Sequence, residues 1–419
     1  MITGIKTFVY KKLNSKFEKF LKASTFPKKN ISFFEKKIIQ FVILKKLNNE
    51  NWDKQIQLPI SQFTHPLFIE ILKKIIPYNP NNLGNWSNEK PFNISGLMEK
   101  KIVQYMSNLL TNKKTELGGY ITSGGTESNL FSMWLGKKYL KKYLKIEQLI
   151  VIHTGLTHYS ISKSADITNL DIVETSLSSN NWGMSPIFLE KTVKKEYEKG
   201  KKGFLIPLTL GYTITGSDDP IKEIDETITK LKEKFPEIRF FCWIDAAFSG
   251  IIKPFVETNF HPFSYKNIST FLTDFHKFPA FPYPSGIILY KKNLIKNIQK
   301  KVSYIERDDT TILGSRSGTM SIAIWYCLKI LNRNGFKKII EKSLKEKNIF
   351  IKKITNQYPK IKIITQSNSV QAGIFSTSKD ERSFLRNMGL KFTKQNIILD
   401  GKRNTVSVYK LYFLPFFKK

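Results

Sequence analysis

Between residues 92 and 300, short apolar runs alternate with longer helical patterns. The apolar runs cover residues 149–152, 204–208, 240–244 and 286–290. The segment "PIKEIDETITKLKEKF" is typical of the helical patterns, because its apolar residues recur every three or four positions. Strands that alternate with helices of this length are typical of parallel sheets, whose strands are joined by helical crossovers. The sequence therefore predicts an α/β fold with a mostly parallel sheet.

The flanking parts of the chain have different patterns. Before residue 75, "FFEKKIIQFVILKKL" and "HPLFIEILKKIIP" both repeat apolar residues at helical spacing. After residue 310, "MSIAIWYCLKILN" begins a long helical pattern, and the strand-like segments "KIKIITQ", "QAGIFST" and "TVSVYKLYF" follow it. We therefore expect an N-terminal helical segment over 1–75, a large α/β domain over 76–310 and a small α+β domain over 311–419. A chain of 419 residues is long enough for this division.

The formal net charge of +34 is the most unusual property of the composition. Such a charge first suggests a nucleic acid or an anionic membrane surface as partner. However, the basic residues are mostly lysines and are spread along the whole chain, whereas phosphate and base recognition favours clustered arginines. We interpret the charge as a solvated surface and expect no specific nucleic-acid partner.

The cysteines and the apolar segments bear on the compartment. Cys242 and Cys327 are far apart within apolar runs, so we expect buried free thiols and no metal site. No apolar run approaches the length of a membrane span, and the N-terminus lacks the apolar core and cleavage site of a signal peptide. The N-terminus is basic and roughly amphipathic, which leaves membrane-surface contact or an organelle address as alternatives to the cytoplasmic location that we expect.

The segment "GGYITSGGTESN" combines a strand end, a glycine pair and the start of a helix. Glycines at such a turn let backbone N–H groups close on an anion, and the helix dipole favours negative charge there. The segment is not a GxxxxGK[ST] loop, which disfavours a nucleoside triphosphate. It predicts a phosphate site, with a glycine turn that only caps a helix as the alternative.

Three more segments place chemically active residues beside predicted strands. His158 in "THYSISKSADI" follows the first apolar run, and Asp245 in "FFCWIDAAFSG" ends a buried run, where a carboxylate is costly without a cation. Lys277 in "TDFHKFPAFPYPSG" follows another apolar run, where a partly buried amine can act as a nucleophile toward an aldehyde. A structural histidine, a helix cap and a surface lysine are the respective alternatives.

Taken together, these groups describe one ligand, pyridoxal 5′-phosphate. The lysine would form a Schiff base with its aldehyde, and the aspartate would keep its pyridine nitrogen protonated so that the ring withdraws electrons. The histidine would cover one face of the ring. The glycine turn at the start of the predicted helix would hold the phosphate of the ligand.

The chain resembles the group II pyridoxal-phosphate-dependent amino-acid decarboxylases, which have the aspartate-aminotransferase-like fold type I. Within that family it is similar to the bacterial histidine decarboxylases and the plant serine decarboxylases. The resemblance depends on seven motifs, which occur in the family's order between residue 81 and about residue 330: "NNLGNW", "GGYITSGGTESN", "THYSISKSA", "GYTITGSDDP", "IDAAFSG", "FHKFPAFPYPSG" and "SYIERDDTTILGSRSG".

The resemblance implies roles for individual residues. Lys277 would hold the cofactor covalently, His158 would stack on its ring, Asp245 would pair with the pyridinium nitrogen, and Ala247 would pack on the opposite face. Tyr304 would belong to the catalytic loop whose tyrosine is linked to protonation after carbon dioxide leaves. The remaining cofactor-binding residues would surround the phosphate or lie near the phenolic oxygen: Ser123, Gly124, Gly125, Thr126, His276 and, for the oxygen, Thr209.

The resemblance also implies a homodimer with shared active sites, in which Ser315 and Arg316 approach the site of the neighbouring subunit. Three positions depart from the family's pattern. Asp274 stands near the phosphate where relatives have small or amide-bearing residues, so it would repel the phosphate unless it points away or pairs with a lysine. Tyr212 and Thr319 are the other two departures. We expect all three to affect the identity of the substrate more than the binding of the cofactor.

The expected function is decarboxylation of an L-amino acid to its amine, with histidine as the first substrate to test. Serine or an aromatic amino acid is the alternative substrate, and a lyase acting on a phosphorylated amine is another reaction open to this fold. An inactive cofactor-binding relative and a basic interaction protein are the alternatives from other classes. The presence of Lys277, Asp245 and His158 favours an enzyme.

Overall fold

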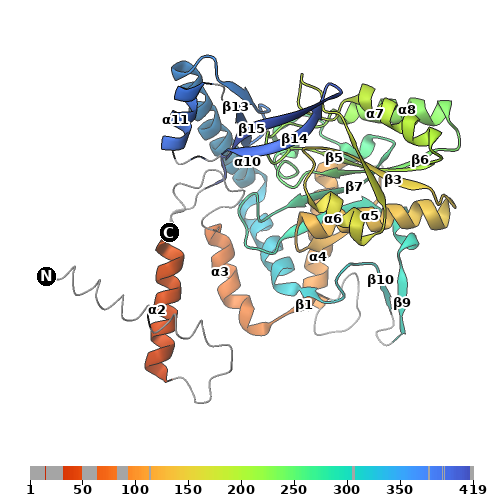
Figure 1. The fold of residues 1–419 in the computed structure, drawn as a ribbon. Helices are drawn as coiled ribbons and strands as arrows, with labels where there is room; N and C mark the ends of the chain where they lie inside the picture. Colours follow the sequence, from red (N-terminus) through yellow and green to blue (C-terminus); the bar gives the residue numbers. More distant parts are fainter. Residues whose placement is uncertain are drawn as a thin grey trace. The chain divides into compact units, whose positions relative to one another are not determined.

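A seven-stranded sheet forms the centre of residues 56–419 in the computed structural model (Figure 1). The strand order is β2-β8-β7-β6-β5-β3-β4. The strands are β2 (Leu117–Thr122), β3 (Leu149–Thr154), β4 (Asp171–Thr175), β5 (Gly203–Thr209), β6 (Arg239–Asp245), β7 (Ile268–Asp274) and β8 (Gly286–Lys291). Neighbouring strands from β4 to β7 are parallel, and β8 is antiparallel to β7 and β2. The predicted mostly parallel sheet is therefore confirmed.

The structure describes residues 15, 32–49, 64–82, 93–112, 115–303, 307–375, 378–388, 390 and 392–415. The chain divides into two units, residues 1–55 and 56–419. Helix α2 (Phe33–Asn49) belongs to the first unit. The finer division expected at residues 75 and 310 stays a prediction.

Helices cover both faces of the sheet. The described helices of the second unit are α3 (Pro66–Ile75), α4 (Asn93–Leu110), α5 (Gly125–Lys138), α6 (Ser160–Ile167), α7 (Pro186–Glu198), α8 (Ile221–Lys234), α9 (Lys253–Val256), α10 (Gly318–Gln357) and α11 (Lys379–Asn387), of which α11 packs against the C-terminal sheet. Single-turn segments are η2 (Ile76–Tyr78), η4 (Tyr139–Tyr143), η5 (Pro262–Ser264) and η6 (Lys292–Asn297). Asn332, at φ 48°, interrupts α10 with a kink.

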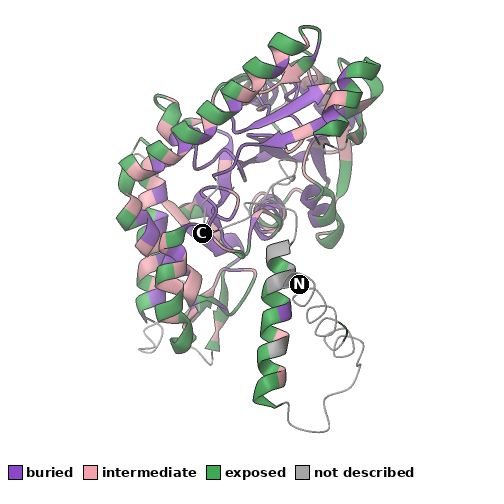
Figure 2. Ribbon diagram, turned by 90° about the vertical axis from the view of Figure 1, so that its left-hand side faces the viewer, coloured by how far each residue is buried: buried purple, intermediate pink, exposed green. Residues whose placement is uncertain are grey.

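Alternate strand residues pack into two separate cores, as the two-residue period of a strand requires. On one face, Phe241 and Trp243 join a cluster with side chains of α5 and α6. On the other face, Phe240 and Cys242 join a larger cluster with side chains of α4, α7, α8 and α10. All residues of β5 are buried, which explains its continuous apolar run. Figure 2 shows the buried strands between helices whose outer faces are exposed.

The C-terminal part forms a four-stranded antiparallel sheet in the order β12-β13-β15-β14. Its strands are β12 (Lys362–Ile364), β13 (Gln371–Phe375), β14 (Thr393–Leu399) and β15 (Lys402–Tyr412). The three strand-like segments of the sequence correspond to β12, β13 and β15. Strand β14 was not predicted, because its first four residues, "TKQN", are all polar. Two short pairs complete the fold: β1 (Asn81–Asn82) with β11 (Arg316–Ser317), and β9 (Lys300–Val302) with β10 (Arg307–Asp309).

Two expectations about single features can be compared with the fold. Cys242 and Cys327 are both buried and free, as expected. Within the described ranges, none of the helices has the length and apolar character that crossing a membrane requires.

Candidate active site

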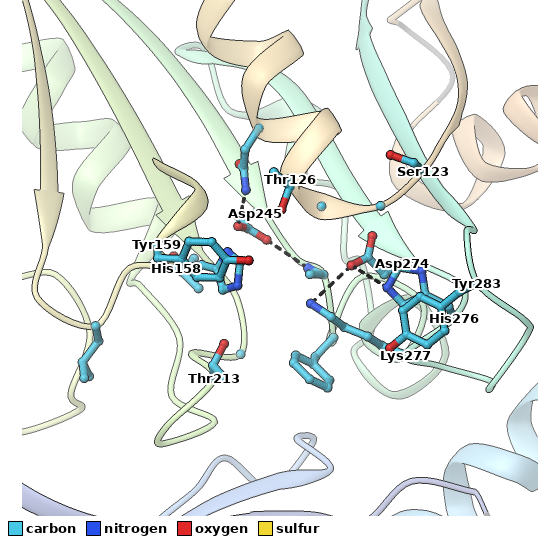
Figure 3. Close-up of a pocket in the computed structure, with 18 residues that line it drawn as sticks. Ser123, Thr126, His158, Tyr159, Thr213, Asp245, Asp274, His276, Lys277 and Tyr283 are labelled. Carbon is cyan, nitrogen blue, oxygen red and sulfur yellow. Dashed lines mark hydrogen bonds and ion pairs between the residues drawn. The ribbon is translucent and has the colours of Figure 1, made fainter. Parts of the chain in front are cut away.

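A cavity of about 300 Å³ lies where the carboxyl ends of β5, β6 and β7 meet the N-terminus of α5 (Figure 3). Ligands of parallel α/β sheets commonly bind at this edge. The cavity brings together every cofactor-binding residue expected from the sequence: Ser123, Gly124, Gly125, Thr126, His158, Thr209, Asp245, Ala247, His276 and Lys277. Tyr304 and most of the "NNLGNW" segment lie outside the described residues.

The N-terminus of α5 forms a cradle that requires glycine. Gly124 has a φ of 145°, and a Cβ atom there would lie 2.8 Å from Cε1 of His276. A Cβ atom on Gly125 would lie 3.3 Å from Oδ2 of Asp274. The two glycines therefore let the helix start closely approach the end of β7. The helix start directs backbone N–H groups and the positive end of its dipole into this space, which suits an anion.

The carboxylate of Asp245 is held by hydrogen bonds on both oxygens. Nδ2 of Asn129 donates to Oδ2 at 2.8 Å, and the backbone N–H of Ala247 donates to Oδ1 at 3.2 Å. Nε1 of Trp243 in turn donates to Oδ1 of Asn129 at 2.9 Å, which fixes the orientation of the amide. Asp245 therefore presents a carboxylate in a set orientation at the cavity wall.

Asn129 is a site residue that the sequence analysis missed. It lies in the quoted segment "GGYITSGGTESN", four positions after Gly125. Residues four positions apart lie on the same face of a helix, so this spacing was a signal that Asn129 faces the cradle. No comparable signal marks the cavity-lining residues Thr213, Phe248 and Tyr283.

We expect Asn129→Ala to weaken cofactor binding by about 10- to 100-fold. The change removes a hydrogen bond to a charged group, which is worth roughly 1.5–3 kcal/mol, and leaves Asp245 free to turn. Fluorescence titration of cofactor into the purified variant checks this. An unchanged dissociation constant would mean that Asp245 keeps its orientation without Asn129.

His158 is half-buried at the cavity wall and is neutral at neutral pH. Burial lowers the pKa of its imidazole below the ordinary value of 6.5. The backbone N–H of Ser160 donates to Nδ1 at 3.3 Å, so the hydrogen of the neutral ring is on Nε2. The ring of Tyr159 lies beside it, with centroids 4.4 Å apart. His158 therefore offers an uncharged flat ring to the cavity.

The lowered pKa of His158 predicts a pH-dependent effect on stability. Below pH 6.5 the unfolded chain binds a proton at this residue that the folded chain does not bind until lower pH. The contribution of His158 to stability is therefore complete above pH 6.5 and decreases as the pH falls below it. We expect the difference in melting temperature between the cofactor-free protein and His158→Gln to decrease from pH 7.5 to pH 5.5. A constant difference would show that the pKa of His158 is not shifted.

Lys277 and Asp274 form an ion pair inside the cavity. Nζ of Lys277 lies 3.2 Å from Oδ2 of Asp274, and Nε2 of His276 lies 3.4 Å from the same oxygen (Figure 3). Nζ also lies 4.6 Å from the centroid of the Phe248 ring. Asp274 thus pairs with a lysine, which is one of the two arrangements expected from the sequence. That lysine is the proposed nucleophile itself.

The other departures from the family's pattern lie away from the cavity wall. Tyr212 is fully buried, and its hydroxyl donates to Asp219 at 2.8 Å and lies 2.9 Å from the hydroxyl of Thr154. Thr319 is the second residue of α10. Neither residue is among the described residues that line the cavity. Asp274 is therefore the departure that can act directly on a bound ligand.

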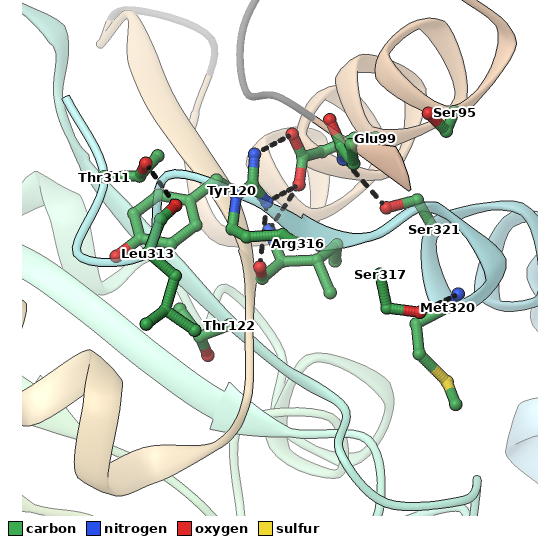
Figure 4. Close-up of polar contacts among 12 residues, drawn as sticks. Ser95, Glu99, Tyr120, Thr122, Thr311, Leu313, Arg316, Ser317, Met320 and Ser321 are labelled. Carbon is green, nitrogen blue, oxygen red and sulfur yellow. Dashed lines mark hydrogen bonds and ion pairs between the residues drawn. The ribbon is translucent and has the colours of Figure 1, made fainter. Parts of the chain in front are cut away.

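The side chain of Arg316 is bound within its own chain (Figure 4). Nη1 and Nη2 both reach the carboxylate of Glu99, with Nη2 2.9 Å from Oε2. Nη1 also donates to the carbonyl oxygen of Ile121 at 3.0 Å. The approach of this segment to a neighbouring subunit stays a prediction. The guanidinium group itself is bound to Glu99 and Ile121 of its own chain.

The chemistry of the cavity fits pyridoxal 5′-phosphate. The glycine cradle suits a phosphate, the oriented carboxylate of Asp245 suits a protonated ring nitrogen, and the amine of Lys277 suits an aldehyde. Asp274 fits least well. Its Oδ1 is buried without a hydrogen-bond partner among the described residues, beside the cradle.

Comparisons with known proteins agree with this chemistry. The family model described as "Pyridoxal-dependent decarboxylase conserved domain" matches residues 64–376. A tryptophan decarboxylase of Clostridium sporogenes is 33% identical over 71% of this chain and 74% of the relative. A histidine decarboxylase of Vibrio anguillarum is 29% identical over 62% of this chain, and the alignment spans 64% of that relative.

Solved structures show the same fold at low sequence identity. A glutamate decarboxylase of Lactobacillus brevis superposes with a TM-score of 0.76 at 17% identity, covering 93% of this chain and 89% of the other. A tryptophan decarboxylase of Catharanthus roseus superposes with a TM-score of 0.74 at 14% identity, covering 98% and 91%. These likenesses support the fold alone.

Proposed function

The chain belongs to the pyridoxal-dependent decarboxylase family, and on that premise we propose that it removes the α-carboxyl group of an L-amino acid with a planar ring in its side chain. Its cofactor is pyridoxal 5′-phosphate. The observation that carries the proposal is the convergence of Lys277, Asp245 and His158 on one cavity, although each lies at or after the end of a different strand.

Each of these residues has a proposed role in the reaction. The cofactor supplies an aldehyde that combines with amines and a pyridinium ring that withdraws electrons from the bond to be broken. Asp245 holds the proton on the ring nitrogen, and Asn129 keeps the carboxylate turned toward it. His158 and Ala247 would confine the ring from its two faces, and Lys277 would provide the amine that binds the aldehyde of the cofactor.

The substrate class is proposed from the relatives and from the cavity wall. The curated relatives given above are a tryptophan and a histidine decarboxylase, both named for amino acids with flat rings. The cavity wall includes Leu156, Tyr159 and Tyr283, which can pack against such a ring. Histidine is the first substrate to test, an aromatic amino acid the second and serine the third.

The homodimer and the role of Tyr304 are also part of the proposal. Both come from the family resemblance stated above. Light scattering on the purified chain should give twice the mass of one chain. The mass of a single chain would contradict the shared active sites. The cytoplasmic location likewise stays a prediction.

The proposed function is tested by absorption spectroscopy followed by peptide mapping. Addition of pyridoxal 5′-phosphate should produce a near-visible band, which borohydride abolishes, leaving the label on Lys277. A screen of carbon dioxide release from histidine, tryptophan, other aromatic amino acids and serine then identifies the substrate. A missing band, or a label scattered over surface lysines, would mean that the site is not assembled. A labelled Lys277 without carbon dioxide release would favour an inactive cofactor-binding relative.

A further inference from the structure

Asp274 places a negative charge inside the cradle that would receive the cofactor's phosphate. The residue ends β7, and its side chain is 2% exposed. Its carboxylate lies between the start of α5 and Gly286: a Cβ atom built on Gly125 would be 3.3 Å from Oδ2, and one built on Gly286 would be 2.8 Å from Oδ1. The carboxylate thus occupies the side of the cradle opposite the helix start.

The described residues that line the cavity carry too little positive charge to neutralise both this carboxylate and a bound phosphate. The described residues that line the cavity include the carboxylates of Asp245 and Asp274 and a single permanently basic side chain, Lys277. The pKa values of His158 and His276 are both lowered by burial, so both rings are neutral at neutral pH. Lys277 is the cation that pairs with Asp274 and is also the amine that must hold the cofactor.

Binding of the cofactor therefore removes the partner of Asp274 and brings a second anion to it. The amine of Lys277 would leave the ion pair in order to hold the cofactor, and the cradle beside the carboxylate would hold the phosphate. Two like charges in one partly buried site would repel each other strongly, because little water screens them. Among the described residues, Oδ1 has no hydrogen-bond partner, and Oδ2 is approached by the imidazole of His276 and the amine of Lys277. Because the imidazole is neutral, Lys277 is the one positive charge that these contacts give to Asp274.

We infer that Asp274 is a positioning residue that pairs with the amine of Lys277 and opposes the phosphate of the cofactor. The cofactor is consequently bound loosely and exchanges with the free pool, so the active fraction of the protein follows the cofactor concentration. This inference rests on the proposed function, since it requires pyridoxal 5′-phosphate in this cavity.

The test compares two ligands that differ only in the phosphate. Dissociation constants of pyridoxal 5′-phosphate and of pyridoxal are measured by fluorescence titration on the full-length chain freed of cofactor. The ratio of the two constants isolates the phosphate, because any change in the reactivity of Lys277 affects both ligands alike. We expect Asp274→Asn, which keeps the shape and removes the charge, to increase the preference for the phosphorylated ligand at least tenfold. Asp274→Ser should act in the same direction.

The control is Asp171→Asn, which removes the same charge from an exposed carboxylate at the start of β4. It should leave the ratio unchanged. Near-ultraviolet circular dichroism shows whether each variant is folded, and the serine variant replaces the asparagine variant if the latter is not. A ratio unchanged in the folded Asp274 variants would overturn the inference while leaving the proposed function intact. Failure of the wild-type chain to bind the cofactor at all would overturn both.

Discussion

Replacing Lys277 with alanine is expected to reduce kcat/KM for decarboxylation by at least about 10³-fold. The change removes the amine that holds the cofactor and exchanges it for the substrate, and no other lysine lines the cavity among the described residues. The variant should also lose the borohydride-stable label. A steady-state assay of carbon dioxide release, together with peptide mapping, measures both effects.

The matched control for this prediction is Lys292→Ala. Lys292 follows β8, its side chain is 65% exposed, and it pairs with Glu116 on the surface. Its replacement should change kcat/KM by less than about twofold, because an exposed ion pair contributes little. Full activity of the folded Lys277→Ala variant would refute the role proposed for this lysine. Melting curves of both variants exclude loss of the fold as the cause.

Replacing Arg316 with alanine is expected to lower the free energy of unfolding by about 3–5 kcal/mol. The change leaves the carboxylate of Glu99, which is 0% exposed, without the cation that it binds. Among the described residues, Glu99 would keep only the backbone N–H of Ile121, which donates to Oε1 at 2.8 Å. The guanidinium also lies 4.9 Å from the ring of Tyr120, so a packing contact is lost as well.

Chemical denaturation of the wild type and variant measures this loss as a shift of the unfolding midpoint. Lys141→Ala is the control, because the Lys141–Glu147 pair lies at the surface, with Glu147 65% exposed, and should be worth about 1 kcal/mol or less. The double variant Glu99→Leu/Arg316→Met should recover much of the stability, since it removes both buried charges. A midpoint shift for Arg316→Ala no larger than that of Lys141→Ala would contradict the prediction.

Much of the fold could be predicted because it depends on local patterns. The apolar runs at residues 149–152, 204–208, 240–244 and 286–290 all lie within β3, β5, β6 and β8. A central strand of a parallel sheet is buried on both faces, so its sequence is continuously apolar and easily recognised. Strand β14 could not be recognised in this way, because its exposed positions are polar and its pairing with β15 is decided by the neighbouring strand.

The sequence predicted those site residues whose charged side chains are energetically costly to bury without a partner. A lysine or an aspartate beside a buried strand end needs a partner, so Lys277 and Asp245 stood out from the many other charged residues. Asn129 did not stand out, because an asparagine on a helix is ordinary until its partners are known. The three-dimensional arrangement identifies those partners as Asp245 and Trp243.

By itself, the sequence determined the fold class, the mostly parallel sheet and many of the residues that line the cavity, because periodicity and residue chemistry are properties of short segments. Only the tertiary structure decided how those residues pair. It placed Asp274 against Lys277 and bound Arg316 to Glu99, from segments more than 200 positions apart in the second case. Burial and ionic contacts between distant segments depend on how the whole chain packs, and no local pattern in the sequence contains that information.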